Sequence, residues 1–171
     1  MVVQVFLLRH EAAEPHGDDL ERPLTEAGQA SARRAAENLA RQGCDFDLCL
    51  VSPAKRARMT AEIYWKAVGR GRLCEERGLA PGADADDLAV LVNAQLEPNR
   101  TRRVLVVGHN PDLLYCLHSW ANEKLSAAVS LAPGSLARID FGDQVRTKEG
   151  RFVACLRAEQ VAVTGDSPLL Q

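Results

Sequence analysis

The chain has 171 residues, of which 46% are hydrophobic and 26% are charged, and both fractions are ordinary for a globular protein. The length predicts a single domain over residues 1–171, and the composition excludes a disordered chain, a coiled coil and a fibrous repeat. Lysine and arginine number 21 against 23 acidic residues, which gives a formal net charge of −2. Because this charge creates no general basic field, we expect no nucleic-acid and no membrane partner, and any anion site must be built locally.

Neither the apolar runs nor the cysteines indicate export. No apolar run approaches the roughly 18 residues that span a bilayer. The first run lacks a preceding basic stretch and is cut short by Arg9, so we interpret it as a strand rather than a signal peptide. The five cysteines are scattered and form no C-x-x-C pair, which favours reduced thiols in a cytoplasmic protein over a disulfide framework or a zinc site.

The first half of the chain alternates strand and helix patterns. Val2–Leu8 is a nearly continuous apolar run, as expected of a strand that is buried on both faces. After a polar loop, Thr25 is the predicted N-cap of a helix that continues to Gln42. Asp47–Val51 is the second predicted strand.

The middle of the chain begins with a helix-start signal. Ser52 is the predicted N-cap and Pro53 the first helical residue of a helix that runs to about Ala67. The segment 73–87 has no regular pattern and is interpreted as irregular. A helix pattern then covers 86–96, with acidic residues capping its start.

The last third supplies three more strands. The predicted elements are a strand over 103–107, a helix over 111–120, and strands over 135–141 and 151–157 joined by a hairpin loop over 142–150. The order β-α-β-α-(α)-β-α-β-β predicts a three-layer α/β/α fold with a mostly parallel central sheet. The last two strands are expected to add antiparallel pairs at one edge.

Ionisable residues gather where the predicted strands end. Arg9 and His10 lie at the end of the first strand. Ser52-Pro53 follows the second strand, with Arg56 three residues after Pro53, and His109 follows the third. Each signal alone is typical of an ordinary strand end. In an open α/β sheet, however, the carboxyl ends of the parallel strands meet at one edge, where ligands bind. Two imidazoles, two guanidiniums and a helix N-terminus at that edge predict an anion site that contains a nucleophile.

Four motifs in this order carry a resemblance to a known family. They are Leu8-Arg9-His10-x-x-Ala13, Arg22-Pro23-Leu24-Thr25-x-x-Gly28, Ser52-Pro53-x-x-Arg56-Ala57-x-x-Thr60-Ala61 and Val107-Gly108-His109-Asn110-Pro111. Together they resemble the histidine phosphatase superfamily, which includes the cofactor-dependent phosphoglycerate mutases. The short chain, without a large helical insertion, is similar to the small branch typified by the SixA phosphohistidine phosphatase. The resemblance implies a phosphoglycerate mutase-like fold.

The resemblance also implies a role for each matching residue. His10 would be the nucleophile that carries a transient phosphohistidine. Arg9 and Arg56 would bind the phosphoryl oxygens, and His109 would donate a further hydrogen bond. No metal ligand and no cofactor is expected, because the cationic side chains neutralise the phosphate charge.

The proton donor or acceptor is less defined by the motifs. Asp19 lies where the small branch carries an acidic residue, so it is the candidate general acid or base. Arg22 either binds substrate phosphate or pairs with an acid to fix its loop. Glu75 and Glu76 are alternative acids, since larger members use a glutamate from that part of the chain. Glu11 replaces the usual glycine after the nucleophile, and we expect its side chain to point away from the His10 face.

The function that follows is a metal-independent phosphohydrolase that removes phosphate from phosphohistidine on a protein, such as a histidine phosphotransfer domain. Two alternatives remain open. One is a phosphatase of small phosphorylated metabolites, and the other is a non-catalytic module that binds phosphorylated ligands. Inorganic phosphate would be the product of either enzyme. The sequence does not fix the oligomeric state, and a monomer is compatible with it.

Overall fold

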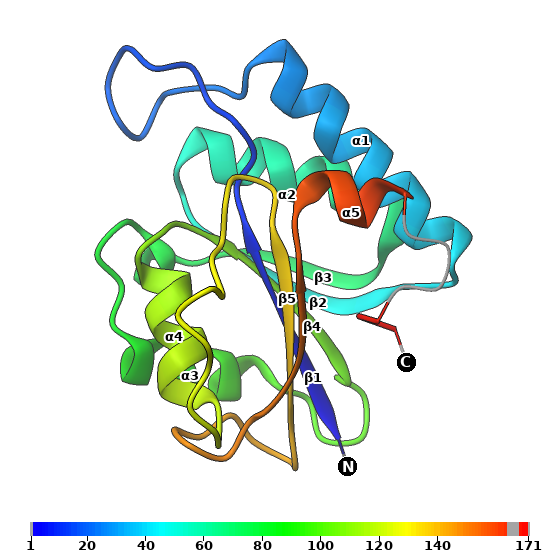
Figure 1. Ribbon diagram of the computed structural model, residues 1–171, viewed down its shortest axis with the longest axis vertical. Coiled ribbons are helices and arrows are strands. Elements are labelled where there is room, and N and C mark those ends of the chain that lie inside the picture. The colour runs from blue at the N-terminus through cyan, green and yellow to red at the C-terminus, as the bar shows by residue number, and fades with distance from the viewer. Residues whose placement is uncertain (1, 164–167, 171) are drawn as a thin grey trace.

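The computed structural model describes residues 2–163 and 168–170, and its six strands form one sheet with helices on both faces (Figure 1). The elements in chain order are β1 (Val3–Arg9), α1 (Glu26–Arg41), β2 (Phe46–Val51), α2 (Lys55–Val68), β3 (Gly69–Glu75), the 3₁₀ helix η1 (Arg77–Leu79), α3 (Ala85–Gln95), β4 (Arg103–Gly108), α4 (Asp112–Trp120), β5 (Leu136–Phe141), β6 (Arg151–Leu156) and α5 (Ala158–Val163).

The sheet has the strand order β3-β2-β4-β1-β5-β6. The pairs β3–β2, β2–β4 and β4–β1 are parallel, whereas β1–β5 and β5–β6 are antiparallel. Both the predicted α/β class and the predicted antiparallel edge are confirmed.

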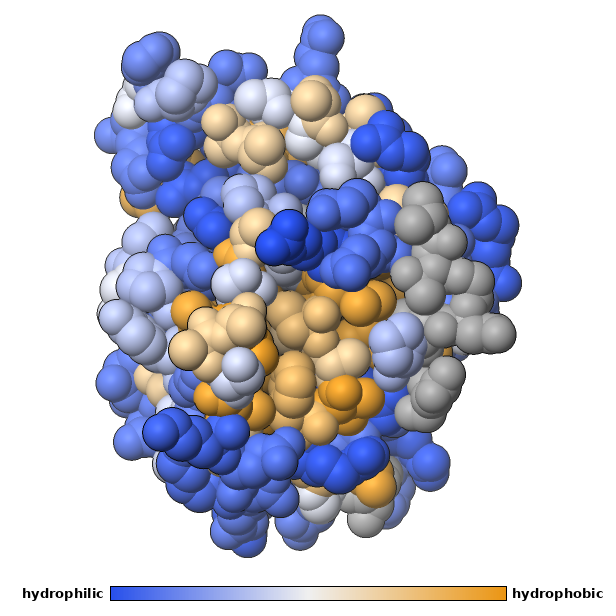
Figure 2. All heavy atoms as spheres, in the orientation of Figure 1, coloured by the Kyte–Doolittle hydropathy of each residue, from blue (hydrophilic) through white to orange (hydrophobic). Residues whose placement is uncertain are grey.

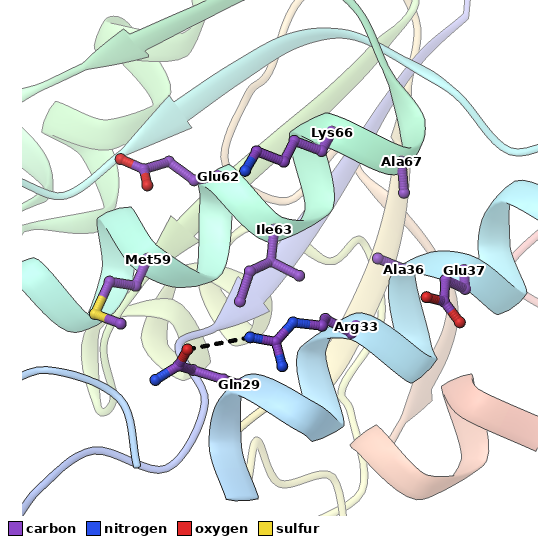
Figure 3. A pocket seen from close by; sticks show the side chains of 9 residues that line it. All are labelled: Gln29, Arg33, Ala36, Glu37, Met59, Glu62, Ile63, Lys66 and Ala67. Atoms are coloured by element: carbon purple, nitrogen blue, oxygen red, sulfur yellow. Dashed lines mark hydrogen bonds between the residues drawn. The ribbon is translucent and has the colours of Figure 1, made fainter. Parts of the chain in front are cut away.

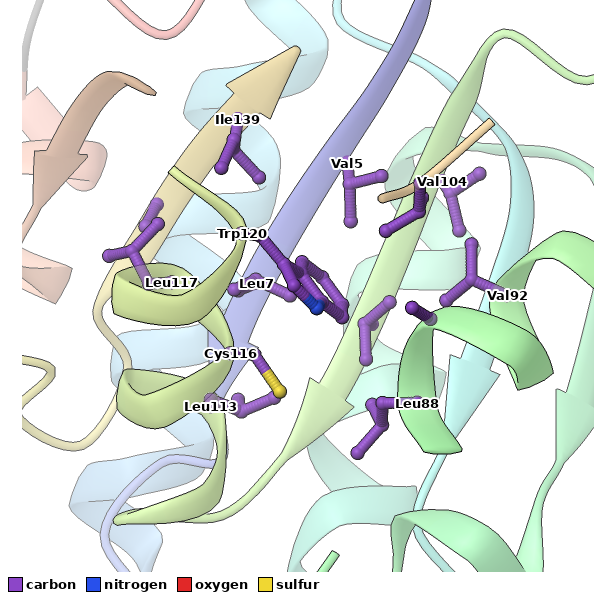
Figure 4. Close-up of a cluster of buried hydrophobic side chains, with 14 of the residues drawn as sticks. Val5, Leu7, Leu88, Val92, Val104, Leu113, Cys116, Leu117, Trp120 and Ile139 are labelled. Carbon is purple, nitrogen blue, oxygen red and sulfur yellow. The ribbon is translucent and has the colours of Figure 1, made fainter. Parts of the chain in front are cut away.

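Alternate residues of each central strand face opposite helical layers, as the two-residue period of a strand requires. In β1, Val5 and Leu7 face the cluster under α3 and α4, whereas Phe6 and Leu8 face the cluster under α1, α2 and α5. Trp120 is completely buried in the first cluster, where its indole N–H donates to the carbonyl of Ala85 at 3.1 Å (Figure 4). The sheet is therefore held between two apolar layers.

The side-chain caps of two predicted helices are confirmed. The Thr25 hydroxyl accepts from the backbone N–H of Gly28 at 2.9 Å, and Asp84 accepts from the backbone N–H groups of Asp86 and Asp87. These side chains satisfy donors that have no partner within the first turn of a helix.

The predicted start of the second helix is wrong. Helix α2 begins at Lys55 with Ala54 as its N-cap, so Ser52 is not the cap and Pro53 is not the first helical residue. The reason is that Ser52 makes hydrogen bonds with β4 and with His109, the residue that follows β4. Its backbone N–H donates to Val107 O at 3.0 Å, and its hydroxyl lies 2.7 Å from a ring nitrogen of His109.

The prediction also missed three elements, which are strand β3, helix α5 and the short helix η1 in the segment interpreted as irregular. Strand β3 lies at the edge of the sheet, in a stretch that contains two glycines and two arginines and lacks an apolar pattern. Gly71 is required there, since a Cβ at this position would lie 2.0 Å from Asp47 O. Helix α5 has only six residues and packs on α1, where the side-chain amide of Asn38 donates to Val161 O at 2.6 Å.

The surface has two further features. Apolar side chains gather in the middle of one face, in front of β5 and β6, with polar residues around them (Figure 2). A groove of about 410 Å³ runs between α1 and α2, and its lining residues include none of the predicted site residues (Figure 3). In the part of the chain that the structure describes, no helix is long and apolar enough to cross a membrane.

We predict that Gly28→Ala destabilises the protein. A Cβ at residue 28 would lie 2.4 Å from the carbonyl oxygen of Ala12, an atom that already accepts from the backbone N–H of Thr25. The free energy of unfolding should fall by roughly 1–3 kcal/mol, as for other overpacked sites. The measurement is urea unfolding, with Gly142→Ala as the control because a Cβ there meets nothing within 4 Å. Equal midpoints for the two variants would contradict the close packing at Gly28.

Candidate active site

The carboxyl ends of neighbouring strands bring the predicted site residues together. Strands β1 and β4 remain in register to their last residues, Arg9 and Gly108. His10 and His109 follow directly, and their ring centroids lie 5.2 Å apart. Ser52 follows β2, the strand on the other side of β4. The parallel register therefore places both histidines and the start of α2 at one edge of the sheet.

His10 is held in one tautomer. Its Nδ1 lies 2.7 Å from the backbone carbonyl oxygen of Glu11, an atom that can only accept, so Nδ1 carries the ring proton. Nε2 then keeps its lone pair, and the Nε–H of Arg56 donates to it at 3.2 Å. Burial lowers the pKa of His10 to about 4, with further lowering by the positive charges of Arg56 and Arg9. At neutral pH the ring is uncharged, and Nε2 carries an unprotonated lone pair.

Arg56 connects the whole site from the first turn of α2, where the sequence places it. The residue is only 4% exposed. Besides His10, its guanidinium contacts His109 Nδ1 at 3.3 Å, the carboxylate of Asp19 at 3.2 Å and the backbone carbonyl of Asp19. A buried guanidinium needs such partners, because an unpaired charge in the interior is costly.

His109 is the second neutral imidazole. Its Nε2 lies 2.7 Å from the hydroxyl oxygen of Ser52, which is completely buried. Burial lowers the pKa of His109 to about 3, and charge on His10 and Arg56 lowers it further. Both histidines are therefore uncharged at neutral pH.

Arg9 is fixed by a segment far along the chain. Its Nη1 donates to the carbonyl oxygen of Leu131 at 2.8 Å, and the side-chain amide of Asn110 donates to the same oxygen at 2.7 Å. The buried Nε–H of Arg9 has no hydrogen-bond partner among the described residues. Arg9 therefore keeps a donor for an added acceptor.

Asp19 and Arg22 form a pair in the exposed loop between β1 and α1. Asp19 Oδ1 accepts from Arg22 Nη2 at 2.6 Å, and Arg22 Nη1 donates to the carbonyl of Glu14 at 3.0 Å. The Asp19 side chain is 60% exposed. Hydrogen bonds from Arg22 and Arg56 lower its pKa, so Asp19 is an ionised carboxylate at the rim of the site. Arg22 fixes the loop through these contacts.

The side chain of Glu11 points away from the anion site, as the sequence predicts. Its Oε1 accepts from the hydroxyl of Ser31 in α1 at 2.8 Å, and the residue is 3% exposed. The carboxylate lies beneath Gly134, where φ is +75° and a Cβ would come within 2.4 Å of Oε1. Glu11 thus reaches His10 through its backbone carbonyl.

The alternative acids have partners outside this group. Glu75 pairs with Arg58 at 3.6 Å, and Glu76 accepts from the side-chain amide of Gln95 at 3.0 Å. Among the candidate acids, Asp19 is the one that contacts Arg56.

Two contributors to the site were missed from the sequence. Ser52 was interpreted as a helix cap rather than as a partner of His109, and its hydroxyl type was the available signal. The carbonyl of Leu131, which holds Arg9, carries no signal at all, because every residue has such a group.

The chain is similar in sequence and in fold to known proteins. The sequence profile of the histidine phosphatase superfamily (branch 1) matches residues 5–80. An uncharacterised protein of Picosynechococcus sp. is 35% identical over 115 residues, which are 65% of this chain and 68% of that protein. The structure of the protein histidine phosphatase SixA complexed with tungstate has a TM-score of 0.81 at 24% identity, over 93% of this chain and 99% of that one.

A candidate phosphohistidine phosphatase SixA from Agrobacterium tumefaciens has a TM-score of 0.72 at 26% identity, over 90% of this chain and 97% of that one. The fold is therefore the phosphoglycerate mutase-like α/β fold in its compact, SixA-type form. The chain belongs to the histidine phosphatase superfamily.

We predict that the two histidines make the protein less stable in acid. An unfolded histidine has a pKa near 6.5, whereas the folded values are about 4 and about 3. Between pH 6.5 and 4 the unfolded chain therefore binds more protons than the native protein, and the free energy of unfolding falls as the pH falls. Each unit of pKa difference corresponds to about 1.4 kcal/mol.

The measurement is urea unfolding between pH 7 and 4.5, on the native chain and on His10→Asn. The variant lacks one of the two groups, so its free energy of unfolding should depend less steeply on pH. Identical slopes for the two proteins would show that His10 is not held neutral.

Proposed function

We propose that this protein is a metal-independent phosphohydrolase that forms a phosphohistidine on His10 and acts on phosphohistidine of a protein, such as a histidine phosphotransfer domain. The observation that carries the proposal is the 2.7 Å contact of His10 Nδ1 with the Glu11 carbonyl, which leaves Nε2 as the nucleophilic atom. Membership of the histidine phosphatase superfamily supports a phosphatase.

In the first step, the substrate phosphate takes the place of some of the contacts among these side chains. Its oxygens accept from Arg9, whose Nε–H is unpaired among the described residues, and from Arg56. His10 Nε2 attacks phosphorus in line, so that a new N–P bond forms as the N–P bond of the substrate breaks. His10 gains positive charge, which its Nδ1–H shares with the Glu11 carbonyl. The leaving imidazole keeps the electron pair of the broken bond.

In the second step, water attacks the phosphorus of phospho-His10 and inorganic phosphate is released. The electron pair of the N–P bond returns to Nε2, while Nδ1 keeps its proton. His10 is therefore a neutral imidazole again. Asp19 is the base that accepts the proton of the water, because Arg22 and Arg56 keep its carboxylate ionised. Arg22 positions Asp19.

The state of Asp19 favours phosphohistidine over a phosphoester. An imidazole whose second nitrogen is protonated departs as a neutral molecule and needs no acid. An alkoxide needs a proton, and an ionised Asp19 supplies none. A protein substrate also fits the rim of the site, since residues 14–21 are all exposed. The five free cysteines agree with a cytoplasmic location.

The test is phosphate release from a histidine-phosphorylated phosphotransfer domain. The native chain should release phosphate in the presence of EDTA, and His10→Ala should reduce the rate by at least about 1,000-fold. His118→Ala is the matched control, since this histidine lies in the last turn of α4, outside the site and its rim, and should leave the rate unchanged.

The other outcomes separate the alternatives. Hydrolysis of small phosphoesters without hydrolysis of the phosphoprotein would assign a metabolite phosphatase. Binding of phosphorylated ligands with no release from either substrate would assign a binding module. Loss of activity in EDTA would contradict the metal-independent reaction.

We further predict that Asp19→Asn slows the second step. The amide keeps the shape of the side chain but cannot accept a proton, so kcat should fall by about 100-fold or more. Phospho-His10 should then accumulate. It is detected by measuring the acid-labile and the acid-stable phosphate bound to the protein. Glu21→Gln is the control, because Glu21 is an exposed acid in the same loop. A variant that hydrolyses phospho-His10 at the native rate would remove Asp19 from the mechanism.

A further inference from the structure

Ser52 contacts His109 from the interior of the protein, at the ring nitrogen that does not face Arg56. Its side chain is completely buried, with the oxygen 2.7 Å from His109 Nε2. The backbone N–H of Ala54 donates to the same oxygen at 3.2 Å. A hydroxyl group can both donate and accept, and its proton can rotate between partners. The direction of the Ser52–His109 hydrogen bond is therefore adjustable.

In the structure this direction is set by Arg56. Its guanidinium has only donors, and Nη2 lies 3.3 Å from His109 Nδ1, so Nδ1 must accept. The single proton of the neutral ring is then on Nε2, which donates to Ser52. In this tautomer His109 presents a lone pair, and not a donor, to Arg56.

A bound phosphate requires the opposite arrangement. Phosphate oxygens are acceptors and attract the guanidinium of Arg56, so Nδ1 of His109 loses its donor and faces an acceptor. A neutral ring can donate from Nδ1 only if Nε2 becomes the acceptor. The Ser52 hydroxyl makes this possible by turning its own proton toward Nε2. The proton of Nε2 is released to solvent water and Nδ1 takes one proton from solvent water, so the charge of the ring is unchanged.

We propose that Ser52 is a positioning residue whose hydroxyl reverses its hydrogen bond with His109 when phosphate binds. The same neutral imidazole accepts from Arg56 in the structure and donates to phosphate once phosphate is bound. The inference deepens the proposed function and rests on it for the identity of the ligand.

The direct test is ¹⁵N NMR of the imidazole nitrogens of the native protein at pH 7, with and without saturating inorganic phosphate. The protonated nitrogen of His109 should move from Nε2 to Nδ1 when phosphate binds. A proton that stays on Nε2, protonation of both nitrogens, or the absence of phosphate binding would each overturn the inference.

A pair of variants separates this role from simple packing. Ser52→Ala should retain the Nε2 tautomer in the presence of phosphate and weaken phosphate binding by about tenfold. Ser135→Ala is the matched control, because Ser135 is also completely buried but its hydroxyl has no hydrogen-bond partner among the described residues. The control should keep the native affinity and the native change of tautomer. Equal effects of both variants would indicate packing alone.

The two proposals fail separately. Hydrolysis of phosphohistidine by a protein whose His109 keeps one tautomer would contradict the role of Ser52 and leave the proposed function intact. A phosphate-induced change of tautomer without hydrolysis of any phosphorylated substrate would contradict the proposed function and leave the role of Ser52 intact.

Discussion

The guanidinium of Arg56 is the interaction on which the site depends. One buried cation contacts both imidazoles and the carboxylate of Asp19, so it joins two strand ends to an exposed loop. These contacts satisfy a charge that would otherwise be unpaired in the interior. In the proposed reaction, phosphate oxygens take the place of some of these partners of Arg56. The same guanidinium thus organises the site and, in the proposed function, binds the substrate.

The placement of the histidines could be predicted from the sequence because it follows from strand register. His10 and His109 each come directly after an apolar run, and parallel strands end at a common edge. The same reasoning placed Arg56 in the first turn of α2, although that helix begins later than Ser52 and Pro53 suggest. Features that depend on the pattern of a single strand or a single turn could therefore be predicted from the sequence.

The features that could not be predicted depend on partners distant in the chain. Strand β3 owes its pairing to β2 and to the close approach at Gly71, and its own sequence lacks the apolar alternation of a strand. Arg9 is held by a backbone carbonyl of Leu131, a group common to every residue. Whether Ser52 caps a helix or contacts an imidazole is decided by β4, which lies about fifty residues further along. In each case, contacts with a segment distant in the chain decide the local structure.

The contact between Glu11 and Gly134 constrains how this sequence can change over time. The carboxylate occupies the space that any side chain at residue 134 would need. A side chain at residue 134 would displace this carboxylate from Ser31, would lie 2.7 Å from the Cβ of Ala158 and would adopt a φ of +75°. Three separate obstacles therefore keep residue 134 a glycine, and a smaller residue at position 11 removes only the first of them.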